Sequence, residues 1–333
     1  MKDEILSRIQ KKFPLVAKPF EAIANELGIS EDEVLAILQE EKKNGIIRQT
    51  SAIFDTKRLG YKSSLVAFKV AEDKIDKAVE IINSHPGISH NYERNHDFNI
   101  WFTLGVSPES KLGLDKTVKI LAELTEADDY IMLPTLKLFK INVKLNTTGK
   151  DEKKEEVKKV VHSEIEMTPL HHAIVQKAQY DIEMVSEPFK KIIDELDIDY
   201  DKFFSILKEL QGAGIMRRFA SILNHRKAGF NANAMVVWDI EEGEKGEAIG
   251  ATAAAFSAVS HCYLRPKYPN WTYNLFTMVH GKTKEETDAI IAEMATEIES
   301  KSHMPLYSSR EFKKVRIEYF TPASEAWEAK YIK

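Results

Sequence analysis

The sequence predicts an α+β protein built by tandem duplication, in which each half carries a winged helix-turn-helix followed by a βαββαβ domain. Residues 44–61 align with residues 213–230 at a constant offset of 169. The pattern Ser-His-x-Tyr-x-Arg occurs at 89–94 and again at 260–265. Helical and strand patterns follow the same order in both halves, so the repeat is one of whole modules.

Two or three short helices are expected near the start of each half. In the first half, apolar residues recur at helical spacing at Phe20, Ile23, Ala24 and Leu27. Gly28 is expected to end that helix, and Ser30 to cap the next helix, which closes near Gly45. Two amphipathic helices joined by so short a turn have the spacing of a helix-turn-helix.

The remainder of each half has the pattern of the ferredoxin-like split βαβ arrangement. The expected elements of the first half are, in order, a strand at 63–70, a helix at 73–85, strands in "GISHNYERN" and "FNIWFTLGV", a helix at 114–124 and a strand at 137–145. The second half repeats this order and is expected to end on a strand at 312–320. The pattern of each half therefore predicts a four-stranded sheet with two helices.

These patterns divide the chain into five segments. They are a helix-turn-helix domain at 1–60, a ferredoxin-like domain at 61–148, a charged linker at 149–165, a second helix-turn-helix domain at 166–229 and a second ferredoxin-like domain at 230–333. The linker is predicted because its sequence is rich in Lys and Glu and contains no Phe, Tyr or Trp.

The composition excludes several classes of protein. With 43% hydrophobic and 30% charged residues, the chain fits a globular protein, and a formal net charge of −5 argues against a general nucleic-acid binder. The single cysteine, Cys262, rules out an intramolecular disulfide and a cysteine-rich metal site. We expect no signal peptide and no membrane span, because no long apolar run occurs, and therefore a cytoplasmic location.

The repeated Ser-His-x-Tyr-x-Arg strand is the strongest chemical signal. Because alternate residues of a strand share a face, one face is expected to carry Ile88, His90, Tyr92 and Arg94, and the matching face Val259, His261, Tyr263 and Arg265. Imidazole and phenol transfer protons, and guanidinium binds a carboxylate through two parallel hydrogen bonds. The row indicates a site for a polyanionic substrate that must receive a proton. The competing interpretation is structural, since duplication alone can preserve such residues.

The helix-turn-helix segments do not have the charge of a DNA reader. A recognition helix needs Arg, Lys, Asn or Gln facing the phosphates and base edges. The candidate helix "SEDEVLAILQEE" instead carries five acidic residues and no basic one. Carboxylates at a groove repel phosphate. We therefore expect a function other than DNA binding, although acidic residues also suit a helix N-terminus.

A helix-turn-helix followed by a ferredoxin-like domain resembles the Lrp/AsnC family of dimeric regulators. The segments "SHNYERNHDFNIWFTL" and "SHCYLRPKYPNWTYNLFTMVHG" more specifically resemble those of the sirohaem decarboxylase family, in which two related Lrp-like subunits act in alternative haem biosynthesis. Here both subunits look fused in one chain. The resemblance implies removal of carboxyl groups from two acetate side chains of sirohaem to give 12,18-didecarboxysirohaem, without a required cofactor beyond this iron-containing tetrapyrrole substrate.

The resemblance also implies roles for individual residues. The residues expected to transfer the proton are His90, Tyr92, His261 and Tyr263. The residues expected to bind the substrate are Arg48, Arg94, His96, Arg217, Arg218, Arg265, Lys267, Tyr268 and Trp271. His96 or His261 is an alternative axial ligand to the substrate iron. No other metal site is expected.

Several alternatives stay open at this level. The arginines at 48, 217 and 218 fit a grip on propionates and fit a surface ion pair equally well. A regulator that senses haem or another small ligand, and a carrier without turnover, are the competing functions. The two halves are expected to form an internal pseudo-dimer, with further homo-oligomerisation undecided. Which half holds the productive site is not decided either.

Overall fold

The computed structural model describes residues 1–11, 13–141, 163–223 and 232–332, and the chain separates into two compact units. The helix-turn-helix unit comprises Met1–Tyr61, Glu156–Lys227 and Glu318–Pro322. The sheet unit comprises Lys62–Glu155, Ala228–Ile317 and Ala323–Lys333. Each unit contains segments from both halves of the sequence, so the duplicated modules associate domain with domain.

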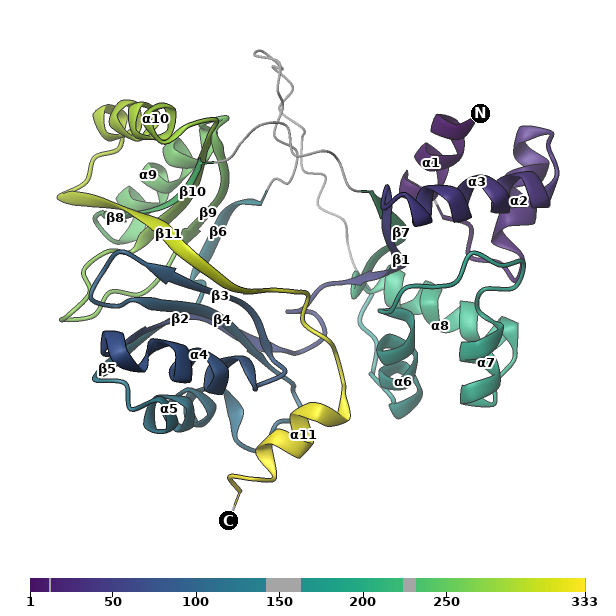
Figure 1. The fold of residues 1–333 in the computed structure, drawn as a ribbon, viewed down its shortest axis with the longest axis horizontal. Helices are drawn as coiled ribbons and strands as arrows, with labels where there is room; N and C mark the ends of the chain where they lie inside the picture. Colours follow the sequence, from purple (N-terminus) through teal and green to yellow (C-terminus); the bar gives the residue numbers. More distant parts are fainter. Residues whose placement is uncertain (12, 142–162, 224–231, 333) are drawn as a thin grey trace. The chain divides into compact units, whose positions relative to one another are not determined.

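The helix-turn-helix unit is built from three helices and one strand of each half (Figure 1). The first half contributes α1 (Lys2–Lys11), α2 (Pro19–Leu27), α3 (Glu31–Lys43) and β1 (Ile47–Phe54). The second half contributes α6 (Pro169–Ala178), α7 (Lys190–Leu196), α8 (Tyr200–Gly212) and β7 (Met216–Leu223). Strands β1 and β7 pair antiparallel and join the two halves in one ribbon.

The expected turn signals are present in this unit. Gly28 adopts φ 69° at the end of α2, a left-handed conformation that glycine accepts without strain. Ser30 and Glu33 form a reciprocal capping box at the start of α3. The predicted helix-turn-helix is confirmed, because these local signals determine where each helix begins and ends.

The sheet unit contains nine strands in the order β5-β2-β4-β3-β11-β8-β10-β9-β6. The strands of the first half are β2 (Lys62–Lys69), β3 (Ile88–Arg94), β4 (Ile100–Val106), β5 (Asp129–Leu133) and β6 (Lys137–Ile141). Those of the second half are β8 (Ala232–Asp239), β9 (Val259–Leu264), β10 (Leu275–Gly281) and β11 (Ser302–Lys314). The helices are η1 (Glu72–Lys74), α4 (Ile75–Asn83), α5 (Gly113–Thr125), α9 (Gly243–Ala255), α10 (Lys284–Glu297) and α11 (Pro322–Glu328).

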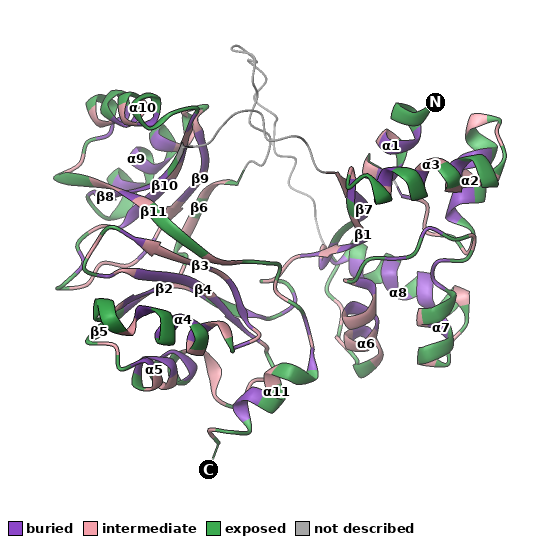
Figure 2. Cartoon of the chain, in the orientation of Figure 1, coloured by how far each residue is buried: buried purple, intermediate pink, exposed green. Residues whose placement is uncertain are grey.

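Helices cover only the outer faces of this sheet (Figures 1 and 2). Apolar residues of α4 and α5 pack on β2 and β4 in one core cluster, and those of α9 and α10 pack on β8 and β10 in a second. The helix-free faces of the two halves share a third cluster, which includes Trp101, Met235 and Phe276. The sheet therefore bends so that the two halves face each other across this inner core.

Strands β6 and β11 cross between the halves. The first part of β11 pairs with β8 of its own half, and its second part pairs with β3 of the other half. In the same way β5 pairs with β2, and β6 continues onto β9 of the second half. Each half thus contributes a strand to the other, which covers the edges that β3 and β9 would otherwise expose.

The strand exchange explains where the predicted elements were wrong. The fourth strand of the first half is β5, which was not predicted, and the expected strand at 137–145 is instead β6, the exchanged strand, described only to Ile141. The last strand is β11 and not residues 312–320. Period-two patterns did not distinguish a strand of the home sheet from one that crosses over.

Parts of the predicted domain division lie outside the described residues. The expected linker at 149–165 is described only from residue 163, and the expected boundary near residue 229 falls within 224–231.

Among the described helices, none combines the length and the apolar character needed to span a bilayer. The cytoplasmic location stays a prediction.

Candidate functional site

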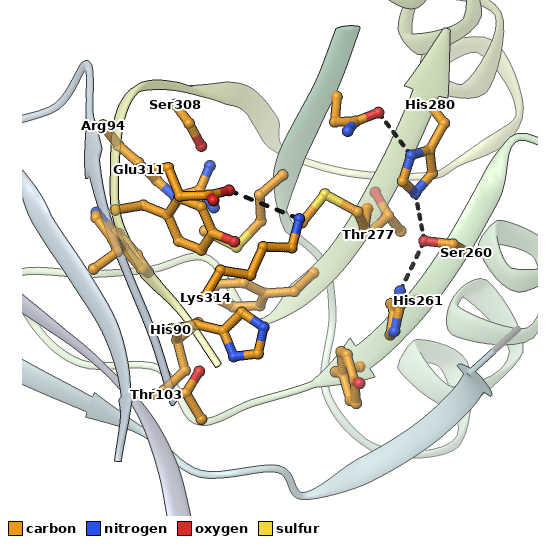
Figure 3. Close-up of a pocket in the computed structure, with 18 of the residues that line it drawn as sticks. His90, Arg94, Thr103, Ser260, His261, Thr277, His280, Ser308, Glu311 and Lys314 are labelled. Atoms are coloured by element: carbon orange, nitrogen blue, oxygen red, sulfur yellow. Dashed lines mark hydrogen bonds and ion pairs between the residues drawn. The ribbon is translucent and has the colours of Figure 1, made fainter. Parts of the chain in front are cut away.

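A cavity of about 580 Å³ lies within the sheet unit, between the inner faces of the two halves (Figure 3). Its size is in the range of ligand-binding cavities, roughly 300–1,000 Å³. Its walls carry Leu65, His90, Tyr92, Arg94, Trp101, Thr103, Asn233, Met235, Ser260, His261, Tyr263, Arg265, Phe276, Thr277, Met278, His280, Ser308, Ser309, Arg310, Glu311 and Lys314. Both Ser-His-x-Tyr-x-Arg strands thus face one shared space.

A β-bulge in each motif strand turns the side chains of the motif toward the cavity. The register shifts between Ile88 and His90 on β3, and between Val259 and His261 on β9. The predicted alternation is therefore wrong at its first residue, because Ile88 and Val259 pack in the outer helix-covered cores. The extra residue lets Ser260 line the cavity next to His261.

The two motif arginines are buried, and each donates a hydrogen bond to a backbone carbonyl of the other half. Arg94 Nη1 donates to the carbonyl oxygen of Leu306, at 2.7 Å, and Arg265 Nη1 donates to that of Leu133. The Nε atoms of both arginines have no hydrogen-bond partner among the described residues. Burial lowers the pKa of each guanidinium to about 10, so both carry a charge at neutral pH.

The cavity histidines are neutral at neutral pH. Burial lowers the pKa of His90, His261 and His280 below the ordinary value, and for His90 the charge of Lys314 acts in the same direction. His90 also lowers the pKa of His261, which shows that the two halves place their imidazoles in one electrostatic neighbourhood. Each imidazole can therefore take up a proton only at a cost, and gives it up readily.

The motif tyrosines stand between the histidines and the arginines. Tyr263 stacks on His261 with ring centroids 6.1 Å apart and lies under the Arg265 guanidinium at 4.9 Å. Tyr92 makes the equivalent contacts in the first half. Burial raises the pKa of both phenols, so each stays protonated and can donate a hydrogen bond.

Strand β11 adds polar residues that the sequence reasoning missed. Lys314 pairs with His90 in the strand register, and Glu311 with Tyr92. The Lys314 ammonium lies 3.7 Å from the Glu311 carboxylate (Figure 3). These residues were missed because their position opposite the motif depends on the exchange of β11 between halves. The segment "REFKK" carries no signal of its own.

Four predicted binding residues do not line the cavity. His96 lies in the loop after β3, where its Nδ1 accepts a hydrogen bond from the Phe98 amide, at 2.9 Å. Trp271 is buried behind Trp101 and packs on His96. Lys267 pairs with Asp239, and Tyr268 donates to the carbonyl oxygen of Met132. Trp271 and Tyr268 pack with Trp101 in the inner core cluster and so support this wall residue.

Three further predicted arginines belong to the helix-turn-helix unit. Arg48 lies on β1, and Arg217 and Arg218 lie on β7, all with exposed side chains. Arg217 forms an ion pair with Asp55, at 2.8 Å. None of them lines the cavity of the sheet unit. Of the two roles left open for these arginines, a surface ion pair rather than a grip on propionates fits Arg217.

Family models match both parts of the chain. The model described as "AsnC-like ligand binding domain" matches residues 58–140 and 227–313. The model described as "Siroheme decarboxylase NirDL-like HTH domain" matches residues 2–48. The duplicated architecture inferred from the repeat is therefore confirmed.

Similar proteins extend this match to the full chain. The chain is 40% identical to "Siroheme decarboxylase" of Hydrogenobacter thermophilus, over 98% of this chain and 96% of that protein. It is 40% identical to "Siroheme decarboxylase beta subunit" of Methanosarcina barkeri, over 43% of this chain and 94% of that subunit. A crystal structure of "siroheme decarboxylase NirDL in co-complex with iron-uroporphyrin III analogue" superposes with a TM-score of 0.81 at 35% identity, over 98% of this chain and 97% of that one.

Proposed function

Because the chain belongs to the sirohaem decarboxylase family and is a carboxy-lyase, we propose that its cavity binds sirohaem and removes the carboxyl groups of two acetate side chains to give 12,18-didecarboxysirohaem. The role is a step of alternative haem biosynthesis. The alternative of a ligand-sensing regulator explains the fold but not the two cationic, histidine-bearing strands that face one cavity.

The observation that carries the proposal is the pair of buried, charged arginines without a carboxylate neighbour. Neither Arg94 nor Arg265 has an ion pair among the described residues, and each keeps an Nε without a partner. A buried charge costs several kcal/mol unless it is paired. Two such guanidinium groups in a ligand-sized cavity suit a substrate that carries several carboxylates.

The reaction needs carbon dioxide to leave and a proton to arrive. The C–C bond to the carboxylate breaks, its electron pair passes into the macrocycle, and the methylene carbon becomes a methyl group when it takes a proton. We assign the proton transfer to His90 and His261, because both line the cavity and both have lowered pKa values. Tyr92 and Tyr263 stack on them and donate hydrogen bonds to the substrate.

Arginine and aromatic groups position the substrate in this proposal. Arg94 and Arg265 bind carboxylates that remain on the macrocycle, while Trp101 and Phe276 offer apolar surface to its plane. Of the two histidines considered as ligands to the substrate iron, His261 lines the cavity and His96 does not. We therefore assign no iron-binding role to His96.

The remaining assignments concern partners and cofactors. We propose that the reaction needs no organic cofactor, since it is redox-neutral and the macrocycle itself accepts the electron pair. The strand exchange supports an internal pseudo-dimer as the working unit. We also propose that the helix-turn-helix unit does not bind DNA, because α3 carries Glu31, Asp32 and Glu33 in its first turn. Further homo-oligomerisation stays undecided.

Anaerobic incubation of the purified protein with sirohaem alone, followed by mass analysis of the tetrapyrrole, tests the activity. Stepwise loss of two molecules of carbon dioxide is expected. Tight binding without a mass change would overturn the enzyme assignment and indicate a tetrapyrrole carrier. A mobility shift of DNA by the protein at low salt would instead support the alternative of a transcriptional regulator. His96→Gln is the matched control for cavity variants, because it changes a half-buried histidine outside the cavity wall and should retain turnover.

A further inference from the structure

The two halves differ at one position of the strand next to the motif histidine. The amide of Gly105 donates to the carbonyl oxygen of Gly87, at 2.9 Å, and the amide of His280 donates to that of Ala258, at 3.0 Å. Gly87 and Ala258 precede the two motifs at the same distance, so Gly105 and His280 are equivalent. The second half therefore has an additional histidine where the first has none.

His280 belongs to a hydrogen-bonded chain that reaches the motif (Figure 3). Its Nδ1 lies 2.7 Å from Asn233 Oδ1, and its Nε2 lies 2.5 Å from Ser260 Oγ. The same hydroxyl lies 2.7 Å from His261 Nδ1. Three consecutive short contacts thus connect β8, β10 and β9 along one wall of the cavity.

The chemistry of these groups gives the chain a direction. Asn233 Oδ1 only accepts, so His280 Nδ1 donates to it and His280 Nε2 carries a lone pair. Ser260 then donates its hydroxyl proton to His280 and accepts from His261 Nδ1. His261 is left with its proton on Nδ1 and a lone pair on Nε2.

The first half lacks this arrangement. Ser89 Oγ lies 3.0 Å from His90 Nδ1, but within the described part of the chain no second imidazole bonds to that hydroxyl. A side chain at Gly105 would meet Ile317 Cδ1 at 2.6 Å from its Cβ, so an apolar residue occupies that space. Ser89 is thus free to donate to His90 or to accept from it, and either tautomer of His90 is satisfied.

We propose that His280 is a positioning residue that acts through Ser260 to hold His261 as its Nδ1–H tautomer, and that His261 is therefore the main proton donor of the two motif histidines in decarboxylation. This inference rests on the proposed function. The lone pair of His261 Nε2 takes a proton from solvent, and the same nitrogen gives it to the methylene carbon as the bond to the carboxylate breaks and carbon dioxide leaves. The ring does not have to turn between the two events, and Nδ1–H keeps its bond to Ser260 throughout.

Two substitutions at His280 separate positioning from packing. His280→Leu removes the acceptor for Ser260, whereas His280→Gln keeps an amide oxygen in reach of that hydroxyl. We expect kcat to fall roughly ten- to a hundredfold in His280→Leu, as for partners that orient a functional histidine. KM should change by less than about twofold, and His280→Gln should recover most of the rate.

The matched pair Ser260→Ala and Ser89→Ala tests the asymmetry. We expect a loss of kcat in Ser260→Ala and a much smaller one in Ser89→Ala. Equal losses, a change confined to KM, or no recovery in His280→Gln would overturn the proposal.

Nitrogen-15 NMR of the histidine-labelled protein provides a readout that needs no turnover. The His261 signals, assigned by their loss in His261→Gln, should show the Nδ1–H tautomer in the parent protein and a mixture in His280→Leu. The titratable groups that face His261 are His90, His280 and the stacked Tyr263, so the tautomer is compared at a pH where both histidines are neutral and the phenol is protonated. An unchanged tautomer would overturn the positioning role, even if the protein did not decarboxylate sirohaem.

Discussion

The His90 side and the His261 side of the cavity share a motif but have different surroundings. In the strand register, His90 stands opposite Lys314 and Tyr92 opposite Glu311. At the equivalent positions of the other half, His261 stands opposite Ile141 and Tyr263 opposite Leu138. Charged neighbours on one side therefore correspond to apolar neighbours on the other.

This difference shows what the duplication retained and what diverged. Both halves retain the Ser-His-x-Tyr-x-Arg residues and the hydrogen bond from each arginine to a backbone carbonyl of the other half. The residues that set the polarity around each imidazole differ. Glu311 and Lys314 line the cavity, whereas Leu138 and Ile141 are about half exposed and lie outside its lining. The cavity is therefore electrostatically different on its two sides.

The largest expected effect comes from removing each motif histidine separately. In His261→Ala we expect kcat to fall by about 10²–10⁴, the usual contribution of a general acid, and in His90→Ala by less. Mass analysis of products over time measures both. Unchanged turnover in both variants would remove the proton-transfer assignment, whereas equal losses would remove only the distinction between the sides.

His85 tests a second difference, because its equivalent in the other half is Phe256. Burial, with a smaller effect of Lys313, lowers the His85 pKa from 6.5 to about 4. The unfolded chain therefore binds the proton first, and stability is lost as pH falls from about 6.5 to 4. The loss is about 2 kcal/mol by pH 5. In His85→Phe this part of the loss should disappear.

Urea unfolding at pH 7 and pH 5 measures this effect, with Trp327 fluorescence as a local probe because that ring lies 4.4 Å from His85. Phe256→His is the reciprocal variant and should add acid sensitivity to the second half. If the parent protein and His85→Phe lose the same stability between the two pH values, His85 does not titrate as its burial indicates.

A smaller effect is expected from the flanking charge. Lys314→Ile gives the His90 side the residue found at the equivalent position of the His261 side. We expect affinity for sirohaem to fall roughly fivefold, with a weaker salt dependence, because a partly exposed charge is screened. Absorbance titration at two salt concentrations measures the change. Ile141→Lys is the reciprocal variant, and unchanged affinity in Lys314→Ile would show that β11 does not bind carboxylates.

The sequence by itself determined the repeat, the helix-turn-helix, most of the ferredoxin-like elements and the family. These depend on local signals such as Gly28, Ser30 and the amphipathic periods, or on the two motif segments. Of the predicted site residues, those on the motif strands line the cavity. The arginines at 48, 217 and 218 do not, because their similarity in the two halves reflects the β1–β7 ribbon and not a shared site.

Only the tertiary structure decided which residues surround the histidines. The exchange of β6 and β11 pairs segments far apart in sequence, so no periodicity brings Lys314 to His90. The bulges before His90 and His261 break the alternation from which faces were predicted, and they place Ser260 within reach of His280. Strand register and bulges arise from long-range pairing. For this reason the difference between the two sides of the cavity could be recognised only in the tertiary structure.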